Sequence, residues 1–189
     1  VLGDYPLRHP ALVNCLDSRA IGTSIAKKFC REVHYSVGER NYFAIGFRND
    51  YGGWELRSER FKGCSTPKHI TTIDNDSDKA LAFEGFMDLL SYLTIKRNDS
   101  PTCNIAVLNS VANVQKAVPF LARHRSIYTF LDNDDAGRKV LSEIERLCPQ
   151  SKVIDQSDFY RRHKDLNDYL RSQQPRKRVI AKPKRGMKL

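Results

Sequence analysis

The sequence predicts an α/β fold, in which a small α+β subdomain precedes a mainly parallel four-stranded sheet flanked by helices. The first observation is an alternation of short apolar segments with helix-like segments from residue 79 onwards. Because each pair of parallel strands needs a crossover connection, this alternation predicts a parallel sheet. The second observation is a change of period over residues 33–57, where short strand-like segments flank a Gly-rich turn, which predicts antiparallel strands.

The expected elements follow these patterns in order along the chain. In the first part we expect helices over roughly residues 9–16 and 18–32, the second capped by Ser18, and strands over 33–37, 42–47 and 54–57. In the second part we expect strands over 80–83, 104–108, 127–131 and 152–154, helices over 86–96, 112–124 and 136–147, and a helical segment that continues to residue 169.

A polar loop over residues 74–78 marks the expected domain boundary. Its alternating acids, Asp74, Asp76 and Asp78, resemble the start of a calcium loop, but the Gly at the sixth position and the Glu at the twelfth position are missing. We therefore interpret the loop as a linker, which gives a subdomain over residues 1–74, a domain over residues 79–170 and a tail over residues 171–189.

Charge and cysteine content limit the class of protein. The net charge is +10, but residues 171–189 hold eight bases and no acid, so the other 170 residues carry 24 bases against 22 acids. We expect this basic tail to be disordered when free. The five scattered cysteines form no CxxC pair, which argues against a zinc site and suits free thiols in a reducing compartment.

No stretch has the length of a membrane span and no signal peptide opens the chain, so we expect a cytoplasmic protein without membrane contact. The chain begins at Val1 without an initiator Met, which leads us to expect a piece of a longer protein.

Carboxylates follow two of the predicted buried strands. Glu84 ends the first strand of the parallel sheet and Asp88 lies one helical turn further on, while Asp132 and Asp134 end the third strand. Open parallel sheets bind ligands at the carboxyl ends of their strands, so these four acids can converge there. They would repel one another unless a divalent cation lay between them. Carboxylates without Cys or His favour a hard ion, Mg²⁺ or Mn²⁺.

Each acid also has an ordinary structural explanation. Asp134 or Asp135 could cap the helix that begins at Ala136, Glu84 could be a turn residue, and Asp88 could be a solvated helix position. Taken singly, these explanations are favoured; the joint occurrence of the acids after apolar strands favours a site. Asp165, at the start of the last helix, could reach the same crevice.

Basic side chains lie along the small antiparallel sheet and the loop after it. They are Arg57, Arg60, Lys62, Lys68 and His69. Such residues usually form a solvated face, and the alternative is a surface that holds a phosphate backbone.

The acidic segments resemble a known family. Glu84-Gly85-Phe86-Met87-Asp88 and Asp132-Asn133-Asp134-Asp135-Ala136-Gly137 resemble the Glu-Gly and Asp-x-Asp motifs of the Toprim fold, and their form is most similar to the primase branch. Lys164-Asp165-Leu166-Asn167-Asp168 is similar to the third acidic motif of that branch. Ile45-Gly46-Phe47, Gly52-Gly53, Arg57 and Pro67-Lys68-His69 resemble the small subdomain that precedes Toprim in bacterial DnaG-type primases. The resemblance covers residues 10–170 and is nearest to primase-like proteins of plasmids and mobile elements.

This resemblance implies a Rossmann-like Toprim fold and a nucleotidyltransferase that synthesises a primer on single-stranded DNA. It implies catalytic roles for Glu84, Asp132 and Asp134, and a Mg²⁺ or Mn²⁺ site formed by Glu84, Asp88, Asp132, Asp134 and Asp165, with no zinc site in this chain. It implies nucleic-acid or nucleotide contacts for Arg57, Lys62, Lys68, Arg138 and Lys164. The implied partners are single-stranded DNA, nucleoside triphosphates and a replicative helicase or mobile-element replication proteins, in the cytoplasm at the nucleoid.

Two positions depart from the family pattern. Asp135 stands where replicative primases often have Arg, and Asn167 replaces an acid. Two other functions remain open at this point: a metal-dependent nuclease similar to OLD-type Toprim nucleases, and a non-catalytic DNA-binding module similar to RecR-like proteins. A topoisomerase would need a further domain with a nucleophilic Tyr, for which 189 residues leave no room.

Overall fold

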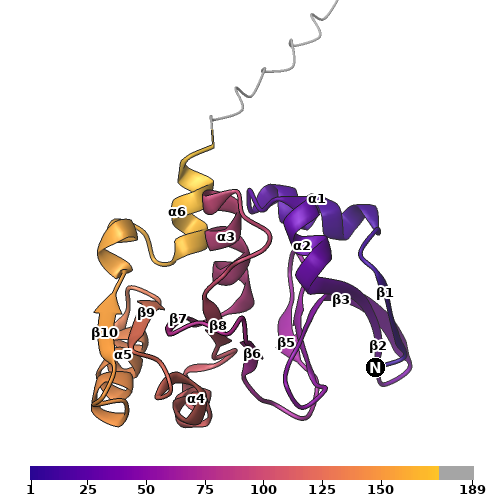
Figure 1. The fold of residues 1–189 in the computed structure, drawn as a ribbon. Helices are drawn as coiled ribbons and strands as arrows, with labels where there is room; N and C mark the ends of the chain where they lie inside the picture. The colour runs from indigo at the N-terminus through magenta and orange to yellow at the C-terminus, as the bar shows by residue number, and fades with distance from the viewer. Residues whose placement is uncertain (175–189) are drawn as a thin grey trace, which may run out of the picture.

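A computed structural model describes residues 1–174, so the prediction for the basic tail beyond Gln174 lies outside the described residues. The chain forms two sheets that lie side by side, with helices α3 and α6 next to each other (Figure 1). The elements before residue 70 are β1 (Gly3–Pro6), α1 (Pro10–Ser18), α2 (Thr23–Phe29), β2 (Cys30–Val37), β3 (Arg40–Arg48), β4 (Trp54–Arg57) and β5 (Lys62–Cys64).

The first sheet is an antiparallel meander with the strand order β1-β2-β3-β4-β5. The expected strands are confirmed as β2, β3 and β4, although β1 and β5 were not expected. The turn between β3 and β4 is held by Asn49, whose Oδ1 accepts hydrogen bonds from the backbone N–H groups of Tyr51 (3.1 Å) and Gly53 (2.9 Å).

The predicted bounds of the second helix, residues 18–32, were wrong at both ends. It begins at Thr23 after Gly22 as N-cap, and Ser18 ends the preceding helix instead, with its Oγ donating to the Cys15 carbonyl at 2.8 Å. The helix stops at Phe29 because the chain from Cys30 onwards pairs with β3 across eight residues. The hydrogen bonds gained by this strand pairing stabilise the strand more than the local helix propensity of the sequence would stabilise a longer helix.

The second sheet has the strand order β10-β9-β7-β8-β6. Four neighbouring strands of this sheet are parallel, which confirms the predicted mainly parallel sheet. They are β7 (Lys79–Phe83), β8 (Asn104–Val107), β9 (Ser126–Phe130) and β10 (Lys152–Asp155). A fifth strand, β6 (Thr71–Ile73), pairs antiparallel with β8 at the edge. The helical elements are α3 (Phe86–Lys96), η1 (Val111–Asn113), α4 (Val114–Leu121), α5 (Asp135–Leu147), η2 (Ser157–Tyr160) and α6 (Leu166–Ser172).

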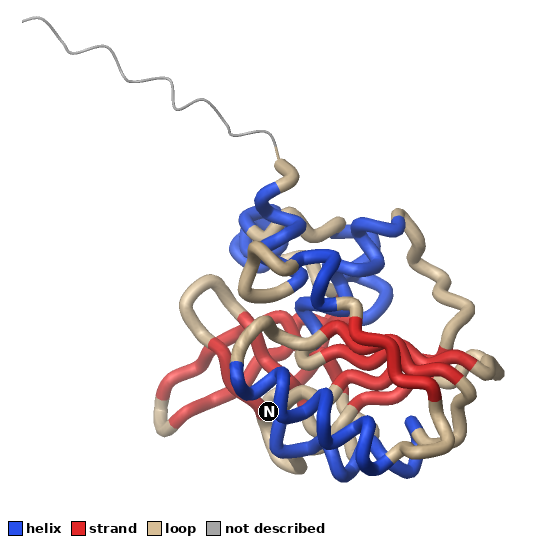
Figure 2. The backbone as a smooth tube through the Cα atoms, turned by 90° about the vertical axis from the view of Figure 1, so that its left-hand side faces the viewer, coloured by secondary structure: helices blue, strands red, loops and turns tan. Residues whose placement is uncertain are grey.

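Side chains of β7 alternate between two cores, as expected for a strand with both faces covered. Leu81 and Phe83 pack into the core that contains the buried face of α3, whereas Ala80 and Ala82 pack into the core formed with α4 and α5. Helices therefore lie on both sides of the strands, as Figure 2 shows. No helix among residues 1–174 is long and apolar enough to span a membrane.

One hydrophobic core joins the two parts of the chain. It contains side chains of α1, α2 and β3 together with side chains of α3, β7 and β8. The ring of Phe47 on β3 stacks on the ring of Phe86 on α3, with centroids 5.3 Å apart and planes 8° apart. The carboxyl end of β7, where α3 begins, is thereby fixed against the first sheet.

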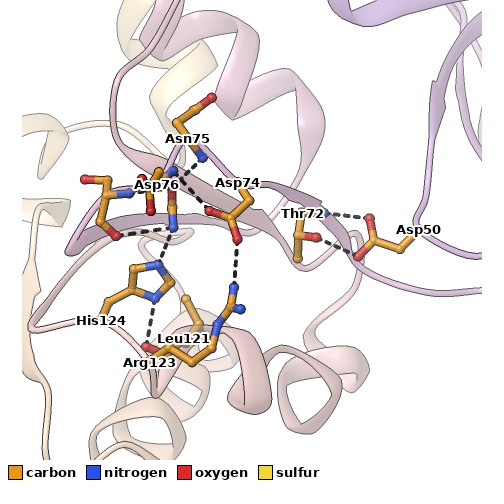
Figure 3. A network of polar contacts seen from close by, with 10 residues as sticks. Asp50, Thr72, Asp74, Asn75, Asp76, Leu121, Arg123 and His124 are labelled. Atoms are coloured by element: carbon orange, nitrogen blue, oxygen red, sulfur yellow. Dashed lines mark hydrogen bonds and ion pairs between the residues drawn. The ribbon is translucent and has the colours of Figure 1, made fainter.

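A buried polar network anchors the loop over residues 74–78 (Figure 3). Asn104 is 3% exposed, and its Oδ1 accepts hydrogen bonds from the backbone N–H groups of Asn75 (2.6 Å) and Ser77 (3.2 Å). Its Nδ2 lies 2.7 Å from Nε2 of His124, whose Nδ1 faces the carbonyl of Leu121. The amide of Asn104 therefore satisfies the loop backbone and a buried imidazole at the same time.

We expect Asn104→Ala to destabilise the protein by about 1–3 kcal/mol, because it leaves buried donors and acceptors without partners. Urea unfolding at neutral pH measures this change. Asn41→Ala is the matched control, because Asn41 is exposed and the expected change there is within about 0.5 kcal/mol. Equal stabilities for the two variants would show that the network contributes little.

Candidate active site in the cleft between the two sheets

A cavity of about 310 Å³ lies between the first subdomain and the carboxyl ends of the parallel strands. Its acidic side chains come from the second domain except for Glu55, and its basic side chains come from the first subdomain except for Lys164. Its charged lining residues are Arg19, Glu55, Arg57, Lys62, Glu84, Asp88, Asp132, Lys164 and Asp165. The structure thus brings four of the five expected metal-site carboxylates to one cavity, with Asp134 just beside it.

Glu84 and Asp132 are placed by the ends of two neighbouring parallel strands. Glu84 is the first residue after β7, and Asp132 is the second residue after β9. The strands β7 and β9 pair directly with each other. The backbone N–H of Asp132 donates to Oε2 of Glu84 at 3.3 Å. Sequence positions 48 residues apart therefore meet at the sheet edge, as the strand pattern predicted.

Asp134 has a structural role beside the cavity. It is the N-cap of α5, and its Oδ1 accepts hydrogen bonds from the N–H groups of Ala136 and Gly137, both at 3.0 Å. A Cβ atom on Gly137 would lie 2.1 Å from the carbonyl oxygen of Asp132, so a side chain at this position would displace the Asp132 backbone. The capping explanation for Asp134 is confirmed, and Gly137 is explained by close packing.

Asn133 fastens the third acidic segment to the end of β9. Its backbone N–H donates to the Lys164 carbonyl at 2.7 Å, and its Nδ2 donates to the carbonyls of Tyr160 (3.1 Å) and His163 (2.9 Å). These bonds place Lys164 and Asp165 at the cavity.

Lys164 bridges two of the carboxylates. Its Nζ lies 3.6 Å from Oδ2 of Asp132 and 3.9 Å from Oδ2 of Asp134. The carboxylate of Asp132 raises the pKa of the Lys164 ammonium, so the lysine stays charged and offsets part of the acidic charge.

Asp88 is buried rather than solvated, which corrects the simple helix-surface explanation. It is 8% exposed, and its Oδ1 is buried without a hydrogen-bond partner. Burial raises the pKa of Asp88 well above its usual range, and the charges of Asp165, Asp132 and Glu84 raise it further. An unpartnered carboxylate oxygen in this position needs a proton or a cation.

The other acids share this perturbation. Burial raises the pKa of Asp132 to about 6, with Glu84 and Asp165 adding to the effect. Burial is also the main reason for the raised pKa of Glu84, and it outweighs the hydrogen bond that Glu84 accepts from Asp132. Clustered groups with raised pKa values are typical of functional sites.

The carboxylates around the cavity suit Mg²⁺ or Mn²⁺ held by a few protein ligands better than a metal ion enclosed entirely by protein side chains. No group of three or more His, Cys, Asp and Glu side chains within residues 1–174 has the geometry to enclose a metal. The oxygens around the cavity nevertheless include the unpartnered Oδ1 of Asp88 and the mutually repelling carboxylates of Glu84 and Asp132. Mg²⁺ is commonly held by one or two carboxylates while waters and substrate phosphates complete its coordination. The residues present are compatible with that arrangement.

The expected basic residues divide into two groups. Arg57, Lys62 and Lys164 line the cavity. Arg138 pairs with Asp135 on an exposed part of α5, outside the cavity lining. Lys68 is exposed and also lies outside the lining. The solvated-face explanation, which concerned the residues of the first subdomain, therefore fits Lys68 better than it fits Arg57 and Lys62.

Two further residues of the cavity were missed in the sequence. Glu55 on β4 points into it, and burial raises the pKa of Glu55 to about 7, against the opposing charges of Lys62 and Lys68. Arg19, just after α1, lines the cavity as well. Glu55 occupies an ordinary strand position, and Arg19 follows a helix far from any motif, so neither gave a sequence signal.

Asn167 connects Arg19 to the second domain. Its Oδ1 accepts from Nη1 of Arg19 at 3.0 Å, and its Nδ2 donates to the Arg19 carbonyl (3.0 Å) and to Oγ of Ser91 (2.9 Å). Burial lowers the pKa of Arg57, and the nearby charge of Arg19 lowers it further. The nearby carboxylates of Asp165 and Asp88 act on the pKa of Arg57 in the opposite direction.

Comparison with known proteins agrees with this geometry. Residues 81–170 match the family described as Toprim-like, and residues 1–66 match a domain of unknown function, DUF8464. A search of curated proteins finds no match.

Among solved structures, the primase fragment of the bacteriophage T7 primase-helicase protein aligns with a TM-score of 0.61 at 18% identity, over 89% of this chain and 74% of that chain. The DnaG catalytic core aligns with a TM-score of 0.56 at 12% identity, over 89% and 74% of the two chains. A DNA primase domain from Pseudomonas aeruginosa aligns with a TM-score of 0.52 at 17% identity, over 88% and 70%.

Residues 81–170 are therefore a Toprim-like domain, with the acids described above at the carboxyl ends of its strands. Together with the subdomain before it, this domain has the fold of a primase catalytic core. The expected resemblance is confirmed at the level of fold.

We expect Asp132→Asn to stabilise the metal-free protein at pH 8 by about 1–2 kcal/mol. The pKa of Asp132, about 6 in the folded protein, exceeds the ordinary value of 3.8, so the wild type loses stability as pH rises through 6. The advantage of the variant should vanish near pH ~3, below the ordinary pKa of 3.8, where Asp132 is largely protonated in the folded and the unfolded state. Urea unfolding at both pH values measures the difference.

Added Mg²⁺ should raise the stability of the wild type at pH 8 more than that of Asp132→Asn, because the ion relieves the repulsion that the substitution has already reduced. Asp135→Asn is the matched control, since the side chain of Asp135 is 88% exposed. A pH-independent effect of Asp132→Asn would contradict the electrostatic explanation.

Proposed function

We propose that the chain is the core of a primase-type nucleotidyltransferase that synthesises a primer on single-stranded DNA with Mg²⁺ or Mn²⁺. The observation that carries the proposal is the cavity itself, in which carboxylates at the ends of β7 and β9 face basic side chains of the first subdomain. One wall suits a metal and the opposite wall suits phosphates, and nucleotidyl transfer requires both. The Toprim-like domain and the primase-core fold support this choice of reaction.

In this reaction a 3′-hydroxyl attacks the α-phosphorus of a nucleoside triphosphate, a new phosphodiester forms, and pyrophosphate leaves. A bound Mg²⁺ or Mn²⁺ would polarise the phosphoryl group and stabilise the leaving oxygen. Glu84, Asp132 and Asp134 would be catalytic and would hold the ion, with Asp88 and Asp165 as further ligands. The raised pKa of Glu84 suits a carboxylate that accepts the proton of the hydroxyl.

The basic residues would hold the nucleic acid and the nucleotide. Arg57 and Lys62 lie on the wall opposite the carboxylates, where they would contact the template or the incoming nucleotide. Lys164 would exchange its contacts with Asp132 and Asp134 for a substrate phosphate once a cation binds. Lys68 and Arg138 would contact DNA outside the cavity. We place the protein with DNA in the cytoplasm, and a replicative helicase or replication proteins of a mobile element as partners, since one solved relative is a fragment of a primase-helicase protein.

We expect Asp132→Asn to lower metal-dependent incorporation of labelled nucleotides on single-stranded DNA by on the order of 10²–10⁴-fold, because a metal contributes several kcal/mol to transition-state stabilisation. Glu84→Gln should have a comparable effect. Asp135→Asn, an exposed neighbour in the same segment, should keep most of the activity. Each assay is run with and without a supplied primer, which separates initiation from extension.

Other outcomes would favour a different function. Nicking of DNA by the wild type without nucleoside triphosphates, lost in Asp132→Asn, would favour hydrolysis with water as the nucleophile. DNA binding without synthesis or nicking would favour a non-catalytic binding module. Full activity in Asp132→Asn would contradict the proposed metal site.

A further inference from the structure

A second cavity lies beside α3, on the face of the parallel sheet that this helix covers. Its volume is about 330 Å³, and among residues 1–174 it shares no lining residue with the cleft. Leu81 of β7 and Tyr128 and Phe130 of β9 form its floor, and its sides are α3 and the chain from Gln156 to Leu166. The proposed reaction uses none of these side chains, so the cavity has no role in it.

The cavity exists because the helical cover of this face is incomplete beside β10. After β10 the chain forms only the four-residue helix η2 before α6 begins at Leu166. Tyr128 on β9 and Ile154 on β10 are partners in register, and both are only half-buried. A short helix thus leaves part of an apolar strand face open.

Aromatic rings line this opening and are held by their neighbours. The rings of Tyr92 and Phe130 have centroids 5.0 Å apart and planes at 59°, and Phe83 stacks on Phe130 with centroids 5.0 Å apart. Phe159 on η2 is 53% exposed, yet its ring contacts the ring of Tyr169 with centroids 4.8 Å apart. Rings fixed in this way offer faces and edges to another aromatic ring.

The charged side chains of the lining are all basic. Lys79 and Lys96 line the cavity, and no acidic side chain of residues 1–174 does. Neither lysine forms an ion pair with a described residue. Asp78 and Asp155 are close along the chain but lie outside the lining, and the carboxylate of Asp155 accepts hydrogen bonds from the backbone N–H and Oγ of Ser157. The cavity therefore combines apolar surface with an excess of positive charge.

The ammonium of Lys96 is held at the exposed edge of the cavity. Its Nζ lies 5.8 Å from the centroid of the Tyr92 ring, a favourable position for a cation on an aromatic face. Burial raises the pKa of Tyr92, so its hydroxyl stays protonated and can donate a hydrogen bond. An anionic group on a bound molecule would meet both donors.

We propose that this cavity binds a small, flat aromatic molecule that carries a negative charge. Ligand cavities are typically of this size, mainly apolar, and equipped with a few polar groups that fix orientation. An uncharged hydrocarbon would leave the lysines without a partner, and a compact polyanion would leave the aromatic rings without a contact. The inference is independent of the proposed function, because it concerns another cavity and is tested by binding alone.

The probe for this test is 2-naphthoate, which joins two fused rings to one carboxylate, and its uncharged counterpart is 2-naphthamide. Titrations followed by two-dimensional amide NMR spectra give both the affinity and the location. We expect 2-naphthoate to shift the amides of β9, η2 and the last turns of α3, with a Kd on the order of 1 mM or below. The amide should bind about two- to fivefold more weakly, the contribution of an exposed ion pair. Shifts confined to the cleft around Asp132 would overturn the inference.

Phe159→Ala tests the aromatic wall. We expect it to weaken binding of 2-naphthoate about five- to tenfold, because it removes one ring contact, and the fold should persist because Phe159 is half-exposed. Phe61→Ala is the matched control, since Phe61 is 41% exposed and lies outside the lining. Equal affinity of the wild type and Phe159→Ala would contradict the proposed site.

The double variant Lys79→Gln/Lys96→Gln tests the charge. It should bind 2-naphthoate and 2-naphthamide equally, whereas Lys27→Gln/Lys139→Gln, with the same change in net charge outside the cavity, should keep the preference for the anion. A preference that persists in the first double variant would refute an anionic ligand at this site. Thermal unfolding checks that each variant is folded. Absence of 2-naphthoate binding to the folded wild type at millimolar concentration would show that the cavity is only an incompletely filled part of the core.

Discussion

The repulsion between carboxylates at the carboxyl ends of β7 and β9 is the constraint around which the cleft is built. Burial and mutual charge raise the pKa of Asp88, Asp132 and Glu84 together, so the folded chain holds these groups at an energetic cost near neutral pH. The structure limits that cost in one visible way, by placing the ammonium of Lys164 between Asp132 and Asp134. A divalent cation would meet the same need more fully.

One wall of the cleft gathers negative charges and the other gathers positive charges, and neutral side chains hold the charged groups of both walls in place. Asn133 ties the segment that carries Lys164 to the acidic side, whereas Asn167 holds Arg19 on the basic side. Both side chains are amides, which donate and accept hydrogen bonds without adding charge. The charges that face the cavity are therefore set by a few residues, while neutral groups carry out the positioning.

Much of this architecture could be predicted from the sequence, because its signals are local. Helix α3 has the predicted bounds, Phe86–Lys96, since apolar periodicity and a preceding glycine define it without reference to distant residues. Strands β1 and β6 were missed because each is short and is held only by pairing with a distant strand. The acids of the site were found from their place after apolar strands, but the bond between Arg19 and Asn167 joins positions 148 residues apart and left no local pattern.

The core shared by the two parts of the chain has a mechanical consequence. Because Phe47 stacks on Phe86, which itself lines the cavity, and the same core runs from α1 to β8, separating the two walls would expose a continuous apolar surface. The cleft is therefore a poor candidate for hinge motion, and the two sheets should unfold as one cooperative unit. A molecule that binds in the cleft would therefore meet two walls held against each other, and selection would depend on fit rather than on closure.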